Sequence, residues 1–98
     1  MTPKSNYADK RDANEPEIVR EFERLGYHVI RMPRTAGFDL LVIGSGQTLI
    51  VEVKNPEYSC TLTEKEIEIQ QTCNRYGVNY HVISDIRQVG DIINSNQI

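Results

Sequence analysis

Two apolar runs separated by a short turn constrain the fold of this chain more than any other feature. Residues 38–43 and 48–54 are rich in the β-branched and aromatic side chains that favour strands. Only residues 44–47, which include two glycines, lie between them. A connection this short joins neighbouring antiparallel strands, so the two runs are predicted to form a β-hairpin.

Three other segments carry apolar side chains at helical spacing: residues 15–25, residues 63–76 and the segment after Ser84. Asn14 is a predicted N-cap for the first helix, and Thr63 with Glu66 fits a capping box for the second. Ser84 is the predicted cap of the third helix.

Residues 27–32 and 78–83 are predicted to be two further strands. The element order is then α-β-β-β-α-β-α, which is typical of an α/β domain with a mixed sheet flanked by helices. Residues 1–13 lack apolar periodicity and are predicted to be a flexible arm, residues 14–94 to form a single domain, and residues 95–98 to fray.

The bulk composition restricts the class of protein without giving a function. With 98 residues, of which 39% are hydrophobic and 26% charged, the chain is predicted to be one globular domain. It has no apolar run of the ~20 residues that span a membrane, and no signal-peptide pattern opens it. Its two cysteines, Cys60 and Cys73, match no metal-ligand spacing and favour a reducing, cytoplasmic setting.

The net charge of −3 and pI of about 5.3 argue weakly against nucleic acid as a partner. The charges are unevenly distributed, because residues 1–34 carry seven Lys or Arg against six acids. That half is compatible with a phosphate-contacting surface, but charge alone favours an ordinary solvated surface.

The hairpin places two carboxylates together. A turn centred between residues 45 and 46 sets Leu41 opposite Ile50, Asp39 opposite Glu52, and Gly37 opposite Lys54. Opposed side chains project from the same face with Cβ atoms about 5 Å apart, here at the end of an otherwise buried face. The other face carries only core-type residues: Phe38, Leu40, Val42, Leu49, Val51 and Val53.

Two carboxylates this close repel each other unless one holds a proton or a divalent cation lies between them. Oxygen-rich sites of this kind suit Mg²⁺ or Mn²⁺. Lys54, roughly 7 Å beyond Glu52 along the strand, can reach a water or a phosphoryl oxygen there. A bulge at either turn glycine would separate the acids, and a simple salt bridge between Lys54 and one acid is the structural alternative.

At these residues the chain resembles a known family. Asp39 followed by Glu52-Val53-Lys54 looks like the D…(D/E)xK signature of the PD-(D/E)xK nuclease superfamily. More closely, about residues 13 to 93 are similar to the stand-alone, phage-type VRR-NUC (virus-type replication-repair nuclease) domain and to a shortened archaeal Holliday-junction resolvase. The family's usual proline before the aspartate is Phe38 here.

The resemblance implies a restriction-endonuclease-like core and Mg²⁺- or Mn²⁺-dependent hydrolysis of DNA phosphodiesters. It implies that Asp39, Glu52 and the Val53 carbonyl bind the metal and that Lys54 assists the nucleophilic water. An acid on the first helix completes the family's metal site, and the matching position is Glu15, with Glu17 as the competitor. Stabilisation of the helix dipole is the structural alternative for both.

The family's glutamine early in the second helix falls at Glu66, which the capping box already uses, and Gln70 one turn later is a possible substitute. Arg31 and Arg34, which flank the loop before Asp39, are the best candidates for phosphate contacts; solvated arginines are the alternative.

The resemblance favours a structure-selective DNA endonuclease that resolves Holliday junctions as a homodimer in the cytoplasm of a phage-infected or bacterial cell. Such enzymes recognise shape and phosphate positions, and no base-reading motif is present. The alternatives are a flap or single-strand nuclease acting as a monomer, and a non-catalytic nucleic-acid-binding module. The intact Asp39, Glu52 and Lys54 argue against the last of these.

Overall fold

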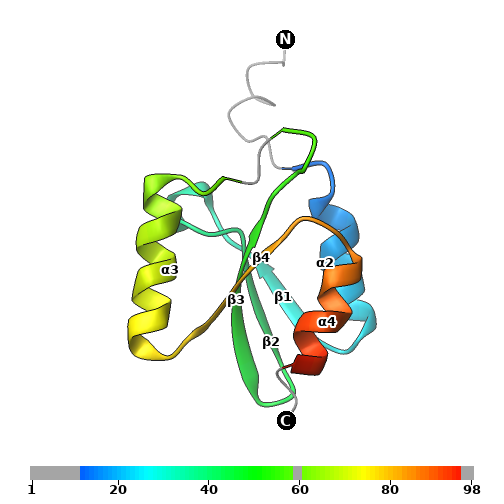
Figure 1. The fold of residues 1–98 in the computed structure, drawn as a ribbon. Helices are drawn as coiled ribbons and strands as arrows, with labels where there is room; N and C mark the ends of the chain where they lie inside the picture. The colour runs from blue at the N-terminus through cyan, green and yellow to red at the C-terminus, as the bar shows by residue number, and fades with distance from the viewer. Residues whose placement is uncertain (1–11, 59–60, 96–98) are drawn as a thin grey trace.

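The computed structural model of the protein describes residues 12–58 and 61–95, whose helices and strands follow the predicted order (Figure 1). The elements are α2 (Glu15–Arg24), β1 (His28–Arg31), the 3₁₀ turn η1 (Arg34–Ala36), β2 (Leu40–Gly44), β3 (Gln47–Val53), α3 (Glu64–Tyr76), β4 (Asn79–Ile83) and α4 (Arg87–Ser95). The predicted arm up to residue 11, the end beyond residue 95 and Cys60 lie outside the described residues.

The four strands form one mixed sheet in the order β1-β2-β3-β4. Strand β2 is antiparallel to both β1 and β3, whereas β4 runs parallel to β3 after the crossover through α3. Helix α3 lies on one side of the sheet, and α2 and α4 lie together on the other (Figure 1). The predicted mixed α/β fold is therefore confirmed.

The β2–β3 hairpin has the predicted register. Its ladder runs from Gly44 opposite Gln47 to Leu40 opposite Val51, without a bulge. Ser45 and Gly46 form the turn with φ angles of 51° and 72°. Positive φ at both central residues is the geometry that matches the twist of two joined strands, and it fixes which side chains face each other.

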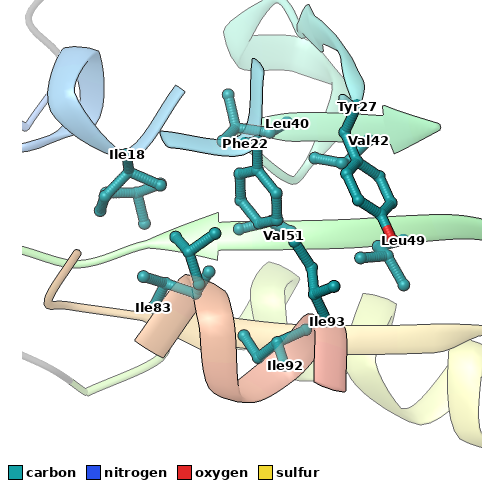
Figure 2. Close-up of a cluster of buried hydrophobic side chains, with 12 residues drawn as sticks. Ile18, Phe22, Tyr27, Leu40, Val42, Leu49, Val51, Ile83, Ile92 and Ile93 are labelled. Carbon is teal, nitrogen blue, oxygen red and sulfur yellow. The ribbon is translucent and has the colours of Figure 1, made fainter. Parts of the chain in front are cut away.

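The core lies between the sheet and the pair α2 and α4 (Figure 2). Five of the six residues predicted for this face are buried, and only Phe38, which precedes β2, is partly exposed. They pack against Ile18 and Phe22 of α2 and Val89 of α4. On the opposite face Ile30 and Ile43 remain 39% and 41% exposed, so the prediction of a second buried face is wrong: α3 covers only part of it.

Asn14 precedes α2 as predicted, but its side chain does not cap the helix. Its Nδ2 instead donates hydrogen bonds to the main-chain oxygens of Lys54 and Ser84, at 3.1 Å each. The beginning of α2 is thereby joined to the ends of β3 and β4.

Helix α3 begins with the predicted capping box, in which the Thr63 hydroxyl accepts from the Glu66 amide and the Glu66 carboxylate accepts from the Thr63 amide. It ends at Gly77, as predicted, with a φ of 74°. The prediction that Ser84 caps the last helix is wrong. Helix α4 begins later, and Gln88 Oε1 accepts from the Ser84 and Asp85 amides.

Within the described residues, no helix combines the length and apolar character needed to cross a membrane.

Candidate active site

A pocket is lined by residues near the end of β3 and near the beginnings of β2, α2 and α3. These ends lie on the same side of the molecule (Figure 1). The volume of the pocket is about 290 Å³. Four acids, three bases and three other residues line it: Asp12, Asp39, Glu52, Glu66, Arg34, Lys54, Lys65, Gly37, Phe38 and Thr63. The predicted Asp39, Glu52 and Lys54 therefore meet in one concave site, together with residues that were not predicted.

Asp39 lies one residue before β2 and just beyond the hairpin ladder. Its amide donates to the Val51 oxygen at 3.2 Å, and its Oδ2 accepts from the Val53 amide at 2.8 Å. The carboxylate thus takes the place of a main-chain acceptor and is held against β3. This double attachment directs Asp39 toward Glu52 even though the ladder has ended.

Glu52 is 4% exposed, which is unusual for a carboxyl group. Burial, the negative charge of Asp39, and hydrogen bonding with Glu66 and Asp39 raise the pKa of Glu52 to about 9. With its pKa raised this far, the Glu52 carboxyl holds a proton at neutral pH unless a cation is bound beside it. That proton is one of the two ways to relieve the repulsion expected between the paired acids.

Lys54 Nζ donates to Glu66 Oε1 at 2.7 Å and lies 3.7 Å from Glu52 Oε2. Burial lowers the pKa of Lys54, but the hydrogen bond and charge of Glu66 raise it by more, so the net shift is upward. Burial raises the pKa of Glu66, and the bonds from Lys54 and the Thr63 amide outweigh this and lower it. Lys54 is therefore a charged ammonium fixed beside a charged Glu66.

Gly37 does not lie opposite Lys54 as predicted. It precedes β2 with a φ of 90°, and a Cβ there would lie 3.2 Å from Ile69 Cγ1 and 3.3 Å from Lys65 Cε. The missing side chain therefore accommodates helix α3. Both the left-handed backbone and this close approach favour glycine.

The other predicted residues separate into two groups. Arg34 lines the pocket, and Glu66 does so while also completing the capping box. Glu15, Glu17, Arg31 and Gln70 do not line it. Glu15 is 1% exposed, and its Oε2 accepts from Arg31 Nε at 2.9 Å, so these two candidates bind each other.

Asp12 and Lys65 line the pocket and were missed. Asp12 fell within the predicted arm, where no sequence pattern marked it. Lys65 lies in the first turn of α3, directly before Glu66. The capping box placed that turn correctly, so the position of Lys65 beside Glu66 was an available signal that was not used.

The donor groups fit a hard divalent cation in type. Across residues 12–58 and 61–95, no group of three or more His, Cys, Asp or Glu side chains is arranged to hold a metal ion. Mg²⁺, however, is commonly bound through one or two carboxylates, with water molecules as the remaining ligands. Asp39 and Glu52 supply two such carboxylates, brought together closely enough for one to retain a proton.

No protein-family model matches the sequence, and no curated protein matches it. A solved structure described as a VRR_NUC domain is similar to the chain, with a TM-score of 0.70 and 26% sequence identity. The similarity covers 84% of this chain and 91% of the other. In fold and element order, the comparison confirms that the chain resembles a VRR-NUC nuclease domain.

Proposed function

We propose that the protein is a Mg²⁺- or Mn²⁺-dependent endodeoxyribonuclease that cuts branched DNA as a homodimer. The observation that carries this proposal is the meeting of Asp39, Glu52 and Lys54 in one pocket of a nuclease-type fold. The reaction adds water to phosphorus and breaks one P–O bond of the phosphodiester, leaving a phosphomonoester on one side and a hydroxyl on the other.

Asp39 and Glu52 are the proposed metal-binding side chains, with the Val53 carbonyl as a main-chain donor. A divalent ion supplies activation of water and neutralisation of charge on the phosphate. Glu52 must release its proton to serve as a ligand, since its surroundings raise its pKa to about 9. Metal binding and the loss of this proton are therefore coupled.

Lys54 is the proposed cationic residue at the reacting phosphate. Its side chain is 13% exposed and its ammonium is held by Glu66, so the charge is presented to the pocket in a fixed position. A fixed cation of this kind stabilises the negative charge that develops on phosphoryl oxygens in the transition state. The ion pair with Glu66 is compatible with this role, because an ammonium group carries three donors.

Arg34 and Lys65 are the proposed contacts to neighbouring phosphates, because both line the pocket from elements outside the hairpin. Arg31 is less suited to this role while it is paired with Glu15. Phosphate contacts position DNA without reading its sequence, which suits an enzyme that recognises branched shape.

Two subunits would be needed to cut two strands of a junction, and the exposed Ile30 and Ile43 offer apolar surface for such pairing. A DNA substrate also favours a cytoplasmic location, in a bacterial cell or a phage-infected one.

The deciding experiment compares cleavage of a synthetic four-way junction, a flap and single-stranded DNA with Mg²⁺ or Mn²⁺. Cleavage restricted to the junction, together with a dimer in sedimentation velocity, supports the proposal in full. Preferential cutting of the flap or single strand by a monomer favours the first alternative. A folded protein that cuts none of the three, but binds them, favours the non-catalytic module.

Asp39→Asn provides the matched variant. The amide keeps an oxygen that can accept from the Val53 amide, so the fold should persist while the metal-binding charge is lost. We expect cleavage to fall by about 100-fold or more, with binding to the junction retained. Normal cleavage by this variant would show that the metal site is placed wrongly.

A further inference from the structure

Tyr58 is an aromatic residue that the fold leaves at the surface. It is 75% exposed, whereas Phe22 and Tyr27 in the core are 0% and 6% exposed. In the sequence it lies between Lys54 and Thr63, and both of these residues line the pocket. A large aromatic side chain is therefore exposed near the proposed reaction site, where covering it with a ligand would be favourable.

The main chain that carries Tyr58 is fixed. The Tyr58 amide donates to the Asn55 oxygen at 3.0 Å, and the Glu57 amide donates to Asn55 Oδ1 at 3.0 Å. Asn55 is buried, and the preceding Lys54 amide donates to the Ile83 oxygen of β4 at 2.9 Å. The exposed ring thus projects from a turn that is attached to the sheet, so binding a ligand there requires little ordering of the backbone.

The turn also limits how far Tyr58 lies from Lys54. The first and fourth Cα atoms of a β-turn are less than about 7 Å apart, and consecutive Cα atoms are about 3.8 Å apart. The Tyr58 Cα therefore lies within roughly 11 Å of the Lys54 Cα. Because bases of one strand rise about 3.4 Å per nucleotide, this distance corresponds to about three nucleotides from a phosphate bound at Lys54.

The surroundings of Tyr58 favour a base over a phosphate. Its chain neighbours Pro56 and Glu57 are exposed and carry no positive charge, whereas Arg34 and Lys65 supply cations in the pocket. An aromatic ring can stack on any base, because every base has a π face. In a continuous duplex the neighbouring bases cover these faces, so stacking on a side chain requires a base that has left the stack.

We infer that Tyr58 stacks on an unpaired base next to the phosphate that is cut. The inference rests on the proposed function, since it assigns how the same site selects its substrate. A flap, a single strand and an opened junction each offer such a base, and a continuous duplex does not. Tyr58 is therefore a specificity-determining residue that distinguishes branched from continuous DNA without reading sequence.

The test measures DNA binding by fluorescence anisotropy in the Asp39→Asn background, in which the DNA stays intact. The probes are a flap substrate and a fully paired duplex of the same length. Tyr58→Ala is expected to weaken binding of the flap by about 5- to 100-fold, the effect of one lost base stack, and to leave binding of the duplex unchanged. The salt dependence should keep its slope, because no phosphate contact is lost.

Two variants are the controls. Tyr58→Phe keeps the ring and should bind the flap as the parent does. Tyr76→Ala removes a tyrosine that is 72% exposed but lies at the other end of α3, about 18 Å along the helix, and should bind both probes as the parent does. The fluorescent base 2-aminopurine, placed at the unpaired positions of the flap, should lose emission on binding the parent and retain it on binding Tyr58→Ala.

Flap binding by Tyr58→Ala at the parent's affinity would overturn the inference, as would equal losses on the flap and the duplex. Undiminished 2-aminopurine emission with the parent at every unpaired position would overturn it without any change at Tyr58. Cleavage by the otherwise wild-type chain separates the inference from the proposed function. Cleavage that is indifferent to Tyr58→Ala refutes the inference alone, whereas base stacking without any cleavage refutes the nuclease and retains Tyr58 as a base-binding residue.

Discussion

Glu52 and Glu66 share one pocket, yet their environments shift their pKa values in opposite directions. Burial and the charge of Asp39 dominate at Glu52, whose pKa rises to about 9. At Glu66, the bonds from Lys54 and the Thr63 amide outweigh burial and lower the pKa. Glu66 gains the close ammonium of Lys54, whose Nζ lies 2.7 Å from Glu66 and 3.7 Å from Glu52, whereas Glu52 is more deeply buried and lies beside Asp39. Two acids of the same type therefore have distinct charge states at neutral pH.

The raised pKa of Glu52 predicts how the stability of the metal-free protein depends on pH. The folded state holds this proton more tightly than the unfolded state, whose carboxyl titrates near 4.5. The contribution is therefore complete below pH 4.5, declines as pH rises, and is lost above about 9. Urea denaturation in a chelator should show stability falling across this range.

Glu52→Gln is the control for that experiment, because the amide cannot titrate and should flatten the decline. Saturating Mg²⁺ should also reduce the decline in wild type, since the ion favours the ionised carboxylate. An equally steep decline in Glu52→Gln would show that another group causes it.

At the scale of elements, one residue of α3 makes two separate contacts. Glu66 completes the capping box through the Thr63 amide and also binds Lys54. The sequence predicted the first role because a capping box is a local signal. The contact with Lys54 was not predicted, because it depends on how α3 packs against the hairpin; the resemblance gave Glu66 only as the position of the family's glutamine.

Two variants separate these roles. Glu66→Gln can still accept from the Thr63 amide but loses the charge that holds Lys54, so we expect near-normal stability and cleavage lowered roughly tenfold. Thr63→Ala loses the hydroxyl that caps the helix, so we expect a loss of about 1 kcal/mol of stability with normal cleavage well below its melting temperature. Chemical denaturation and single-turnover cleavage check both. A fully active Glu66→Gln would show that Lys54 does not depend on Glu66.

The hairpin turn offers a test that is confined to stability. Ser45 has a φ of 51°, where asparagine is better tolerated than serine, so Ser45→Asn should stabilise the protein by about 0.5 kcal/mol. Gly46 has a φ of 72° and open space around it, so Gly46→Ala should cost about 1 kcal/mol through backbone strain alone. Urea midpoints measure both.

The turn lies at the opposite end of the hairpin from Asp39, so DNA cleavage should be unchanged in both variants. An unaltered midpoint in Gly46→Ala would mean that the turn is not held in this conformation.

The hairpin also shows what a sequence can and cannot predict about a site. A two-residue turn fixes the register, so the proximity of Asp39 and Glu52 followed from residue spacing. The attachment of Asp39 to the Val53 amide did not, because the ladder ends at Leu40 and a side chain replaces it. Asp12, and the mutual pairing of Glu15 and Arg31, depend on how α2 meets the sheet, which no local pattern encodes.

At the scale of the whole molecule, the net charge is −3 although the proposed substrate is a polyanion. The described pocket concentrates Arg34, Lys54 and Lys65 around the acids, so attraction to DNA must be local. The overall charge is therefore a poor guide to nucleic-acid binding. The placement of a few cations at one end of the sheet is more informative.

Lys65→Gln should test that local attraction. In the Asp39→Asn background, we expect weaker junction binding and a salt dependence whose logarithmic slope falls by about 1, the effect of one lost phosphate contact. Arg75→Gln is the matched control, since Arg75 is exposed on the same helix about 15 Å farther along. Fluorescence anisotropy over a range of salt concentrations measures the slopes. Equal effects of the two substitutions would argue against a specific phosphate contact at Lys65.

The two hydrogen bonds of the Asn14 side chain can form only after distant parts of the chain have been synthesised. They join Asn14 to residues 40 and 70 positions farther along the chain. Contacts across such long loops form late in folding, because the entropy of closing the loop must be overcome first. On the ribosome, the second contact must wait until Ser84 has emerged, long after the residues of the hairpin. A nascent chain from which Ser84 has not yet emerged therefore carries Asp39, Glu52 and Lys54 without this hydrogen bond.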